Sequence, residues 1–324
     1  MSLTQKIDFA LILKVTNANP NGDPLNGNRP RTDFQGFGEM TDVCLKRKIR
    51  DRLQDKGESI FVQSDEKKTD GMTSLASRAR SNDKIKIKNK DGQEIEVPIG
   101  LGTDAFSDPK NKDQTAKQAC EKWIDVRSFG QVFAFKAKKG RSDSQSETNN
   151  SSSGVSIPIR GPVTIQSAFS VQPINITSTQ ITKSVNGDDT TDGSRSSDTM
   201  GIKHRVDHGV YVAFGAISPQ LAERTGFSDD DAEKIKTALT ELFEGDASSA
   251  RPEGSMQVLK LIWWKHNSKA GQCSSAKVHG KLRKIIEERI KNKSIDGLIE
   301  DITKEKLTVE ESKKTLIPEI LDGF

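Results

Sequence analysis

The chain has 324 residues, of which 32% are hydrophobic and 30% charged, so it can form one large domain with insertions, or two domains. Lys and Arg exceed Asp and Glu by only 50 − 46 = 4, which excludes a strongly basic protein and requires any nucleic-acid site to come from local clustering. The three cysteines are far apart, which excludes a disulfide framework. The sequence shows no signal-peptide pattern, which excludes secretion, and no apolar run of about 20 residues, which excludes a membrane span. We therefore expect a soluble cytoplasmic protein.

The first elements in the chain are a strand, a polar loop and a helix. Residues 7–15 carry apolar side chains at period two, which predicts a strand with one face on a core. The loop from Asn17 to Asp33 is crowded with Asn, Pro and Gly, a composition that resists helix and sheet pairing. A helix is predicted over residues 42–54, with Thr41 as its N-cap and an apolar seam of Leu45, Ile49 and Leu53.

Four further elements complete the predicted core. They are a strand at 161–171 with Val163, Ile165, Phe169 and Val171 on one face, a strand at 206–218, a helix that opens at the capping pattern Ser228–Asp231, and a strand at 255–264. The order is β-α-β-β-α-β, the split βαβ arrangement of ferredoxin-like and RNA-recognition-motif domains. The predicted fold class is therefore α+β.

Two insertions interrupt this core. The first contains a hairpin at 84–99 around the turn signal Asp91-Gly92, a helix near 113–124 and a serine-rich loop at 141–154. The second has a polar centre, 184–199, that cannot form a core, so we expect a mobile, projecting arm. The resulting segments are a first part of the core (1–55), an insertion (56–155), a core strand (156–172), the arm (173–206), the rest of the core (207–265) and a C-terminal extension (266–324).

The strongest charge cluster lies on the first helix. Five basic residues occur in seven positions, Lys46, Arg47, Lys48, Arg50 and Arg52, interrupted by Asp51. A solvated charged face is one interpretation, but no row of acidic partners at i,i+4 is apparent in the sequence. Phosphate binding by these side chains is therefore favoured over a plain solvated face, with Arg29 and Arg31 adding to one basic surface.

Two other stretches offer polar contacts. DVRSFGQVF (125–133) supplies Arg127, Ser128 and Gln131, although it can equally be a partly buried helix or turn. MGIKHRVDHG (200–209) supplies Lys203, His204 and Arg205. His204 and His208 have the i,i+4 spacing of helical metal ligands, but the alternation that follows predicts a strand, so we expect no metal and no cofactor. Aromatic residues make up only 5% of the chain, which disfavours a surface that stacks many bases.

Four blocks together resemble a known family. NPNGDPLNGNRPRTD (19–33), DVRSFGQVFAF (125–135), GPVTIQSAFS (161–170) and MGIKHRVDHGVYVAFG (200–215) are similar to the CRISPR-associated backbone subunit of type I-C Cascade complexes, in the Csd-two/Csh-two branch of the Cas-seven superfamily. The blocks occur in the expected order over most of the chain, whereas the segment after about residue 265 does not contribute to the likeness.

The resemblance implies a hand-shaped, modified RNA-recognition motif. The core would be the palm, 56–155 the fingers and web, and 173–206 the thumb. It implies a non-catalytic subunit that binds CRISPR RNA and assembles head to tail with further copies into a helical filament for antiviral defence. The other implied partners are the Cas-five and Cas-eight type subunits and target DNA paired to the guide. The implied RNA contacts are Asn21, Arg29, Arg31, Lys46, Arg47, Lys48, Arg50, Arg127, Ser128, Gln131, Met200 as a base-displacing wedge, Lys203, His204 and Arg205.

Two alternatives remain open. Relatives in type III systems cut RNA with an aspartate in the loop after the first strand, and Asp23 and Asp33 lie in that loop, so a metal-dependent ribonuclease is the alternative function. A structural shell protein without nucleic acid is a third class, which leaves the basic helix unexplained.

Overall fold

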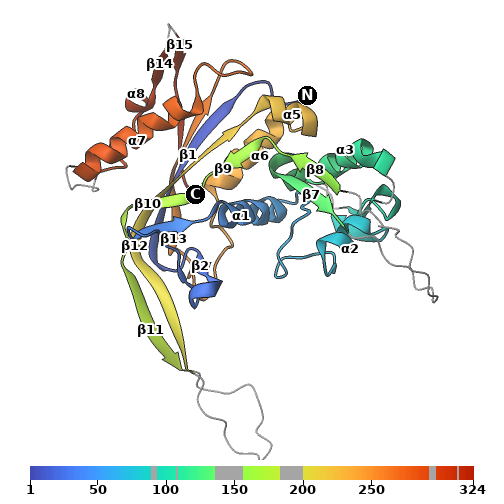
Figure 1. The fold of residues 1–324 in the computed structure, drawn as a ribbon, viewed down its shortest axis with the longest axis horizontal. Coiled ribbons are helices and arrows are strands. Elements are labelled where there is room, and N and C mark those ends of the chain that lie inside the picture. Colours follow the sequence, from blue (N-terminus) through green and yellow to red (C-terminus); the bar gives the residue numbers. More distant parts are fainter. Residues whose placement is uncertain (89–92, 107–108, 136–155, 183–199, 292–296, 312–313) are drawn as a thin grey trace, which may run out of the picture.

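The computed structural model describes residues 1–88, 93–106, 109–135, 156–182, 200–291, 297–311 and 314–324. Within them, eight strands form one antiparallel sheet whose main path is β16-β13-β1-β12-β10-β4, with β9 and β11 also paired to β12 (Figure 1). These strands are β1 (Ile7–Ala18), β4 (Phe37–Met40), β9 (Val163–Ile165), β10 (Ala168–Pro173), β11 (Ile176–Thr182), β12 (Met200–Ile217), β13 (Met256–Lys265) and β16 (Glu319–Asp322).

The predicted order β-α-β-β-α-β is present in β1, α1 (Asp42–Asp55), β10, β12, α6 (Asp229–Thr240) and β13. The four strands lie side by side as β13-β1-β12-β10, each antiparallel to its neighbour. α1 begins where the Thr41 side chain accepts a hydrogen bond from the Cys44 N–H, and α6 begins at the predicted capping box of Ser228 and Asp231. The protein is thus a mixed α/β fold with a large antiparallel sheet.

Both faces of the sheet are covered. Phe9 and Leu11 of β1 point into the core under α1 and α6, whereas Ala10 and Ile12 point into a second core under α7 (Ser275–Lys291). Figure 1 shows α1 and α6 on one side of the sheet and α7 on the other. The expectation that the first strand has one buried face is therefore wrong, because the C-terminal extension supplies a second helical layer.

The rest of the extension is also part of the fold. It contains α8 (Lys304–Leu307) and a small hairpin of β14 (Val309–Glu311) and β15 (Lys314–Leu316), and it ends in β16, which pairs with β13. The sequence pattern that could have revealed α7 is the apolar seam Val278, Leu282 and Ile285, all three of which are buried.

The strand predicted at 161–171 is broken in two. β9 ends at Ile165 and β10 begins at Ala168, and between them the Gln166 N–H donates to the Phe214 carbonyl. The break changes which side chains face inward, so Val171 enters the second core while Phe169 is 45% exposed. The expectation of a single apolar face across this segment is wrong for that reason.

The first insertion folds around its own core. Phe61, Trp123 and Phe133 pack as a ring cluster, with the Phe61 and Trp123 centroids 4.7 Å apart. The elements around it are α2 (Leu75–Arg80), β5 (Lys84–Lys88), β6 (Glu94–Pro98), η2 (Asp104–Phe106), η3 (Pro109–Asn111), α3 (Lys112–Lys122), α4 (Ile124–Phe129), β7 (Gly130–Ala134) and β8 (Ser156–Arg160). The predicted hairpin is β5 paired with β6, and the predicted helix is α3. α5 (Pro219–Thr225) follows β12.

Two segments for which the sequence predicted no regular structure contain strands. The Asn17–Asp33 loop holds a short hairpin of β2 (Gly22–Asp23) and β3 (Arg29–Pro30) around η1 (Pro24–Asn26), with Gly27 and Asn28 at positive φ in its turn. The flanks of the second insertion form a two-stranded ribbon, β11 with the first half of β12, which projects from the sheet (Figure 1). The centre of that insertion (184–199), the serine-rich stretch (141–154) and the Asp91-Gly92 turn lie outside the described residues.

No helix among the described residues is long and apolar enough to cross a membrane.

Candidate nucleic-acid interface

The basic cluster of α1 is neutralised by carboxylates within the protein. The ion pairs are Lys46 with Asp42, Arg47 with Asp51 and Asp246, Lys48 with Asp246, Arg50 with Asp125, and Arg52 with Asp55 and Glu241. The expectation that this helix lacks acidic partners is therefore wrong. Asp42, Asp51 and Asp55 lie three or four residues from their partners on the helix itself, so the helix sequence contains them. The other three, Asp125, Glu241 and Asp246, are far away in the sequence, on α4, at the end of α6 and on the loop after it, and the helix sequence does not reveal them.

Lys48 and Arg50 are held inside the structure rather than on its surface. The Lys48 side chain is 0% exposed, and burial lowers its pKa below the ordinary value. Burial would raise the pKa of Asp246, but the Lys48 ammonium and the guanidinium groups of Arg251 and Arg47 lower it. Arg50 Nε lies 3.1 Å from an oxygen of Asp125, which is 1% exposed. Neither cation is available to a phosphate in this arrangement, in contrast to the expectation from the sequence.

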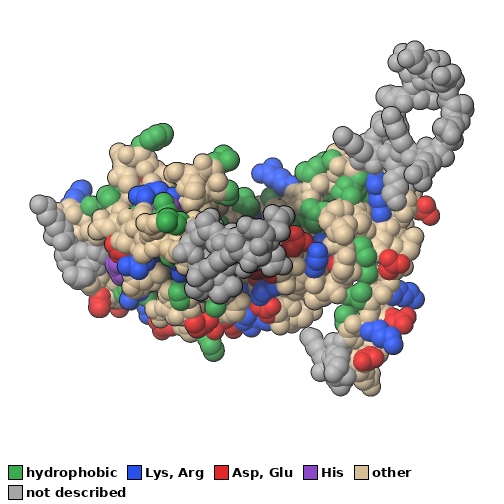
Figure 2. Space-filling model, turned by 90° about the horizontal axis from the view of Figure 1, so that it is seen from below, with side chains coloured by type: hydrophobic (Ala, Val, Ile, Leu, Met, Phe, Trp, Pro, Cys, Tyr) green, Lys and Arg blue, Asp and Glu red, His purple; other side chains and the backbone are tan. Residues whose placement is uncertain are grey.

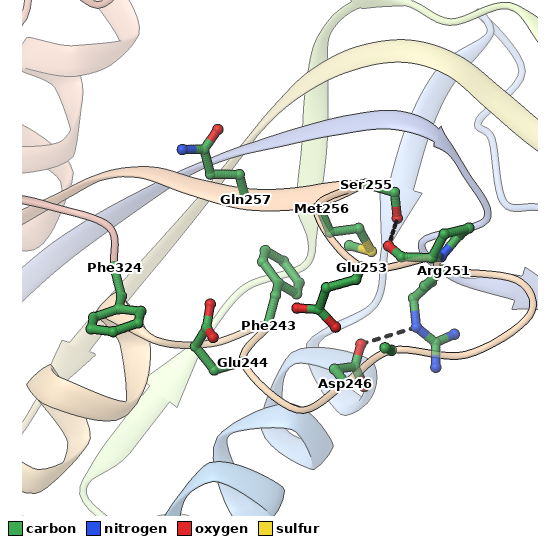
Figure 3. Close-up of a pocket in the computed structure, with 12 residues that line it drawn as sticks. Phe243, Glu244, Asp246, Arg251, Glu253, Ser255, Met256, Gln257 and Phe324 are labelled. Carbon is green, nitrogen blue, oxygen red and sulfur yellow. Dashed lines mark hydrogen bonds and ion pairs between the residues drawn. The ribbon is translucent and has the colours of Figure 1, made fainter.

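The surface next to Asp246 is acidic. A pocket of about 310 Å³ opens there. Figure 3 shows that Asp246 faces Arg251 in this pocket, while the carboxylates of Glu244 and Glu253 lie near the rings of Phe243 and Phe324. Two carboxylates that have no ion pair among the described residues repel a phosphate backbone. This side of α1 is therefore poorly suited to RNA.

The second predicted contact stretch is also structural. Arg127 Nε and Nη2 donate to the two carboxylate oxygens of Asp231 at 3.0 and 2.8 Å, which fixes α4 against the first turn of α6. Ser128 is fully buried, and the Gln131 side chain donates to the Val132 carbonyl. The expectation that Arg127 and Ser128 face RNA is not met by this geometry, because Asp231 and the core occupy them.

Polar side chains of the hairpin after β1 make hydrogen bonds that fix its turns and attach it to α1. Asn21 Oδ1 accepts hydrogen bonds from the N–H and the hydroxyl of Thr41, at 2.9 and 3.0 Å, so it ties the hairpin to the start of α1. Asp23 accepts from the Leu25 N–H and lies 3.3 Å from Arg31. Asp33 accepts from the N–H groups of Gln35 and Phe37, both at 2.9 Å. Both aspartates thus serve in turns.

The ribbon keeps exposed cations. Alternation along β12 puts Met200, Ile202 and His204 on one face and Lys203 and Arg205 on the other, since paired residues of β11 and β12 share a face. Arg205 is 46% exposed with Asp207 at 3.6 Å, and Lys203 is exposed with no ion pair among the described residues. The ribbon therefore offers phosphate-binding groups that α1 does not.

The hairpin and the ribbon meet on the face that carries Met200. Arg29 Nη1 donates to the Ser178 hydroxyl at 3.2 Å, and that hydroxyl lies 2.8 Å from His204 Nδ1. His204 is thus engaged with Ser178, and among the described residues no three His, Cys, Asp or Glu side chains converge as metal ligands. The structure brings Arg29, His204 and Met200 to one face of the ribbon.

Figure 2 shows the molecule from the side on which the ribbon projects. Lys and Arg side chains are interspersed there with Asp and Glu side chains and with apolar groups. This pattern agrees with the near balance of 50 basic and 46 acidic residues. A nucleic acid on this face would meet local cations rather than a continuous basic field.

Comparison with known proteins gives a coherent set of matches. The family model described as CRISPR-associated protein Cas7 matches residues 5–309. A CRISPR-associated protein Cas7 of Haloferax volcanii is 28% identical over 254 residues, which cover 77% of this chain and 67% of that protein. Among solved structures, this chain is similar to one titled CRISPR RNA-guided surveillance complex, pre-nicking, with 15% identity, a TM-score of 0.42, and coverage of 80% of this chain and 78% of that chain. A second, titled CRISPR RNA-guided surveillance complex, has 15% identity, a TM-score of 0.35 and coverage of 80% and 68%.

Proposed function

This chain belongs to the Cas7 family of CRISPR-associated proteins, and we propose that it is a backbone subunit of a CRISPR RNA-guided surveillance complex in the cytoplasm. The observation that carries the proposal beyond the family is the projecting ribbon with exposed Lys203 and Arg205. An exposed ribbon with cations on one face can lie along a single strand and neutralise its phosphates without reading its sequence. The guide then selects the target by base pairing.

We assign the parts of the hand as follows. The sheet with α1 and α6 is the palm, the insertion that folds around Phe61, Trp123 and Phe133 is the fingers and web, and the ribbon is the thumb. Copies of the chain contact one another head to tail, which is a heterologous contact that propagates as a helix along the guide. Met200 and Ile202 share one face at the far end of the described ribbon and are both strongly exposed, which suits the insertion of an apolar wedge beside a displaced base.

The four sequence blocks at 19–33, 125–135, 161–170 and 200–215 favour the type I-C branch of the family. In that setting the partners are the Cas-five and Cas-eight type subunits and target DNA paired to the guide.

The subunit is proposed to be non-catalytic, because Asp23 and Asp33 use their carboxylate oxygens for turn hydrogen bonds and for Arg31. Asp23→Ala and Asp33→Ala should leave guide and target lengths unchanged. Loss of a metal-dependent cleavage on either substitution would instead establish the ribonuclease alternative.

The guide-binding role is tested with Lys203→Glu combined with Arg205→Glu. Guide RNA retained during purification from a host that expresses a CRISPR array should fall strongly, and the slope of log affinity against log salt should shrink by about 1.4, or about 0.7 for each lost phosphate contact. Lys304→Glu with Lys314→Glu is the control, since both lysines are exposed on the C-terminal extension and the charge change is the same. Equal guide retention by the two double variants would contradict the ribbon assignment.

A further inference from the structure

A groove lies between α7 and the edge of the sheet, on the opposite face from α1 and α6. It is formed by two adjoining cavities of about 210 and 510 Å³, which share Gln166 and Arg283. The groove lies at the break between β9 and β10, where Gln166 and Ser167 line it. Phe37 and Phe169 line the smaller cavity, and Phe169 is 45% exposed.

The side chains of the groove combine rings with polar groups and one guanidinium. The Arg283 guanidinium lies over the Phe214 ring, with its Cζ 4.3 Å from the centroid, and has no ion pair among the described residues. Exposed Gln166 and half-buried Ser167 add an amide and a hydroxyl at the break. Ile286 and Ile290 complete the helix wall, and Glu287 is the one carboxylate among the residues that line the smaller cavity.

The basic side chains on the outer face of α7 differ from those of α1 in whether they have an acidic partner. Whereas every basic residue of the α1 cluster has a carboxylate partner, Lys281, Arg283 and Lys284 have none among the described residues. Arg283 lines the groove, whereas Lys284 lies about 100° further round the helix and does not line it. The cation of α7 that is available to an anion in the groove is therefore Arg283.

We propose that this groove binds a segment of single-stranded nucleic acid, with bases against Phe37 and Phe169 and a phosphate on Arg283. Accessible rings beside an unpaired guanidinium are the combination that holds single strands irrespective of sequence. The unpaired Arg283 favours a nucleic acid over an apolar protein helix, because such a helix has no charge for it to meet. The proposal goes beyond the guide-binding role and does not depend on it, since α7 and the ribbon lie at different ends of the molecule (Figure 1).

The test uses the full chain and an octamer of deoxythymidine with one 5-iodouracil, crosslinked by light and mapped by mass spectrometry. A matched uridine octamer distinguishes an RNA segment from a DNA strand. Wild-type protein should crosslink within residues 163–173, with binding measured in parallel by fluorescence anisotropy. Phe169→Ala should reduce affinity at this site about tenfold, since stacking on one ring is lost. Arg283→Glu should reduce the salt slope by about 0.7, the value for one lost phosphate contact.

The ribbon variant Lys203→Glu with Arg205→Glu separates this proposal from the guide-binding role. It should lose guide RNA while it keeps the crosslink at 163–173. Phe169 is 45% exposed and outside both large cores, so its truncation is expected to lower the melting temperature only slightly, which near-ultraviolet circular dichroism and a thermal melt verify. Crosslinks confined to the ribbon, or unchanged affinity in both groove variants, would overturn the proposal. Groove variants that keep the crosslink but lose another protein subunit would assign the groove to a protein partner instead.

Discussion

At the scale of single residues, the role of a charged side chain here depends on its partner. Arg127 and Lys203 are both basic and both lie in stretches that resemble family motifs, yet Arg127 is held by Asp231 and Lys203 is exposed. Burial would raise the pKa of Asp231, but hydrogen bonds from Arg127 and from the Ser228 backbone outweigh it, and the pKa lies below its ordinary value. Arg127 is thus a structural residue.

Arg127→Met should lower the free energy of unfolding by about 3 kcal/mol at pH 7, because it leaves a buried carboxylate without its cation. Since the pKa of Asp231 is depressed in the folded protein, the stabilisation is complete above the pKa of the unfolded chain and is lost as pH falls through the folded value. Urea unfolding of both proteins at pH 7 and near pH 3 checks this. A stability difference that stays constant over this range would contradict the ion-pair explanation.

At the scale of elements, α1 is fixed by the loop that follows α6. Asp246 of that loop contacts Arg47, Lys48 and Arg251, and Glu241 contacts Arg52 and Lys56. These contacts lie beside the apolar seam of Leu45, Ile49 and Leu53, which packs on the sheet. α1 is therefore a structural helix attached by both apolar and charged contacts.

Replacing the acidic member of the Lys48–Asp246 pair should reduce stability more than replacing the basic member. Asp246→Ala leaves the buried Lys48 amine without its ion-pair partner, so we expect a loss of about 3–5 kcal/mol in the free energy of unfolding. Lys48→Met should cost only about 1 kcal/mol, because Asp246 keeps Arg47 and Arg251. Denaturant titration of both variants measures the difference. Equal losses would mean that the remaining cations do not compensate for Lys48.

At the scale of the whole molecule, the C-terminal extension completes the core. α7 buries Val278, Leu282 and Ile285 against Ile12, Val212 and Trp264 of the sheet, and β16 extends the sheet beyond β13. A sheet of this kind exposes an apolar face unless a second layer covers it. The extension is therefore part of the fold, and the uncovered remainder of that face is the groove beside Phe169.

Leu282→Ala should lower the free energy of unfolding by about 3 kcal/mol through lost burial and a residual cavity. Lys284→Ala on the exposed face of the same helix should change it by no more than about 0.5 kcal/mol. Thermal and urea unfolding of the full chain distinguish the two. A Leu282 variant as stable as the wild type would indicate that α7 packs too weakly to belong to the core.

The sequence by itself determined the β-α-β-β-α-β order at the centre of the fold, but not the helical layer and edge strand that the C-terminal extension adds. The seam of α1, the Thr41 cap, the Ser228–Asp231 capping box and the alternation of β12 are local patterns, so they were readable within a few residues. Only the tertiary structure decided the role of the charges. Lys48 meets Asp246 across 198 positions, Arg127 meets Asp231 across 104, and Arg50 meets Asp125 across 75. A long-range ion pair requires proximity in space and leaves no periodic signal in the chain, unlike the i,i+4 pairs of Lys46 with Asp42 and Arg47 with Asp51. It was therefore the fold that paired Lys48 and Arg50, and that left Lys203, Arg283 and Lys284 without an ion pair among the described residues.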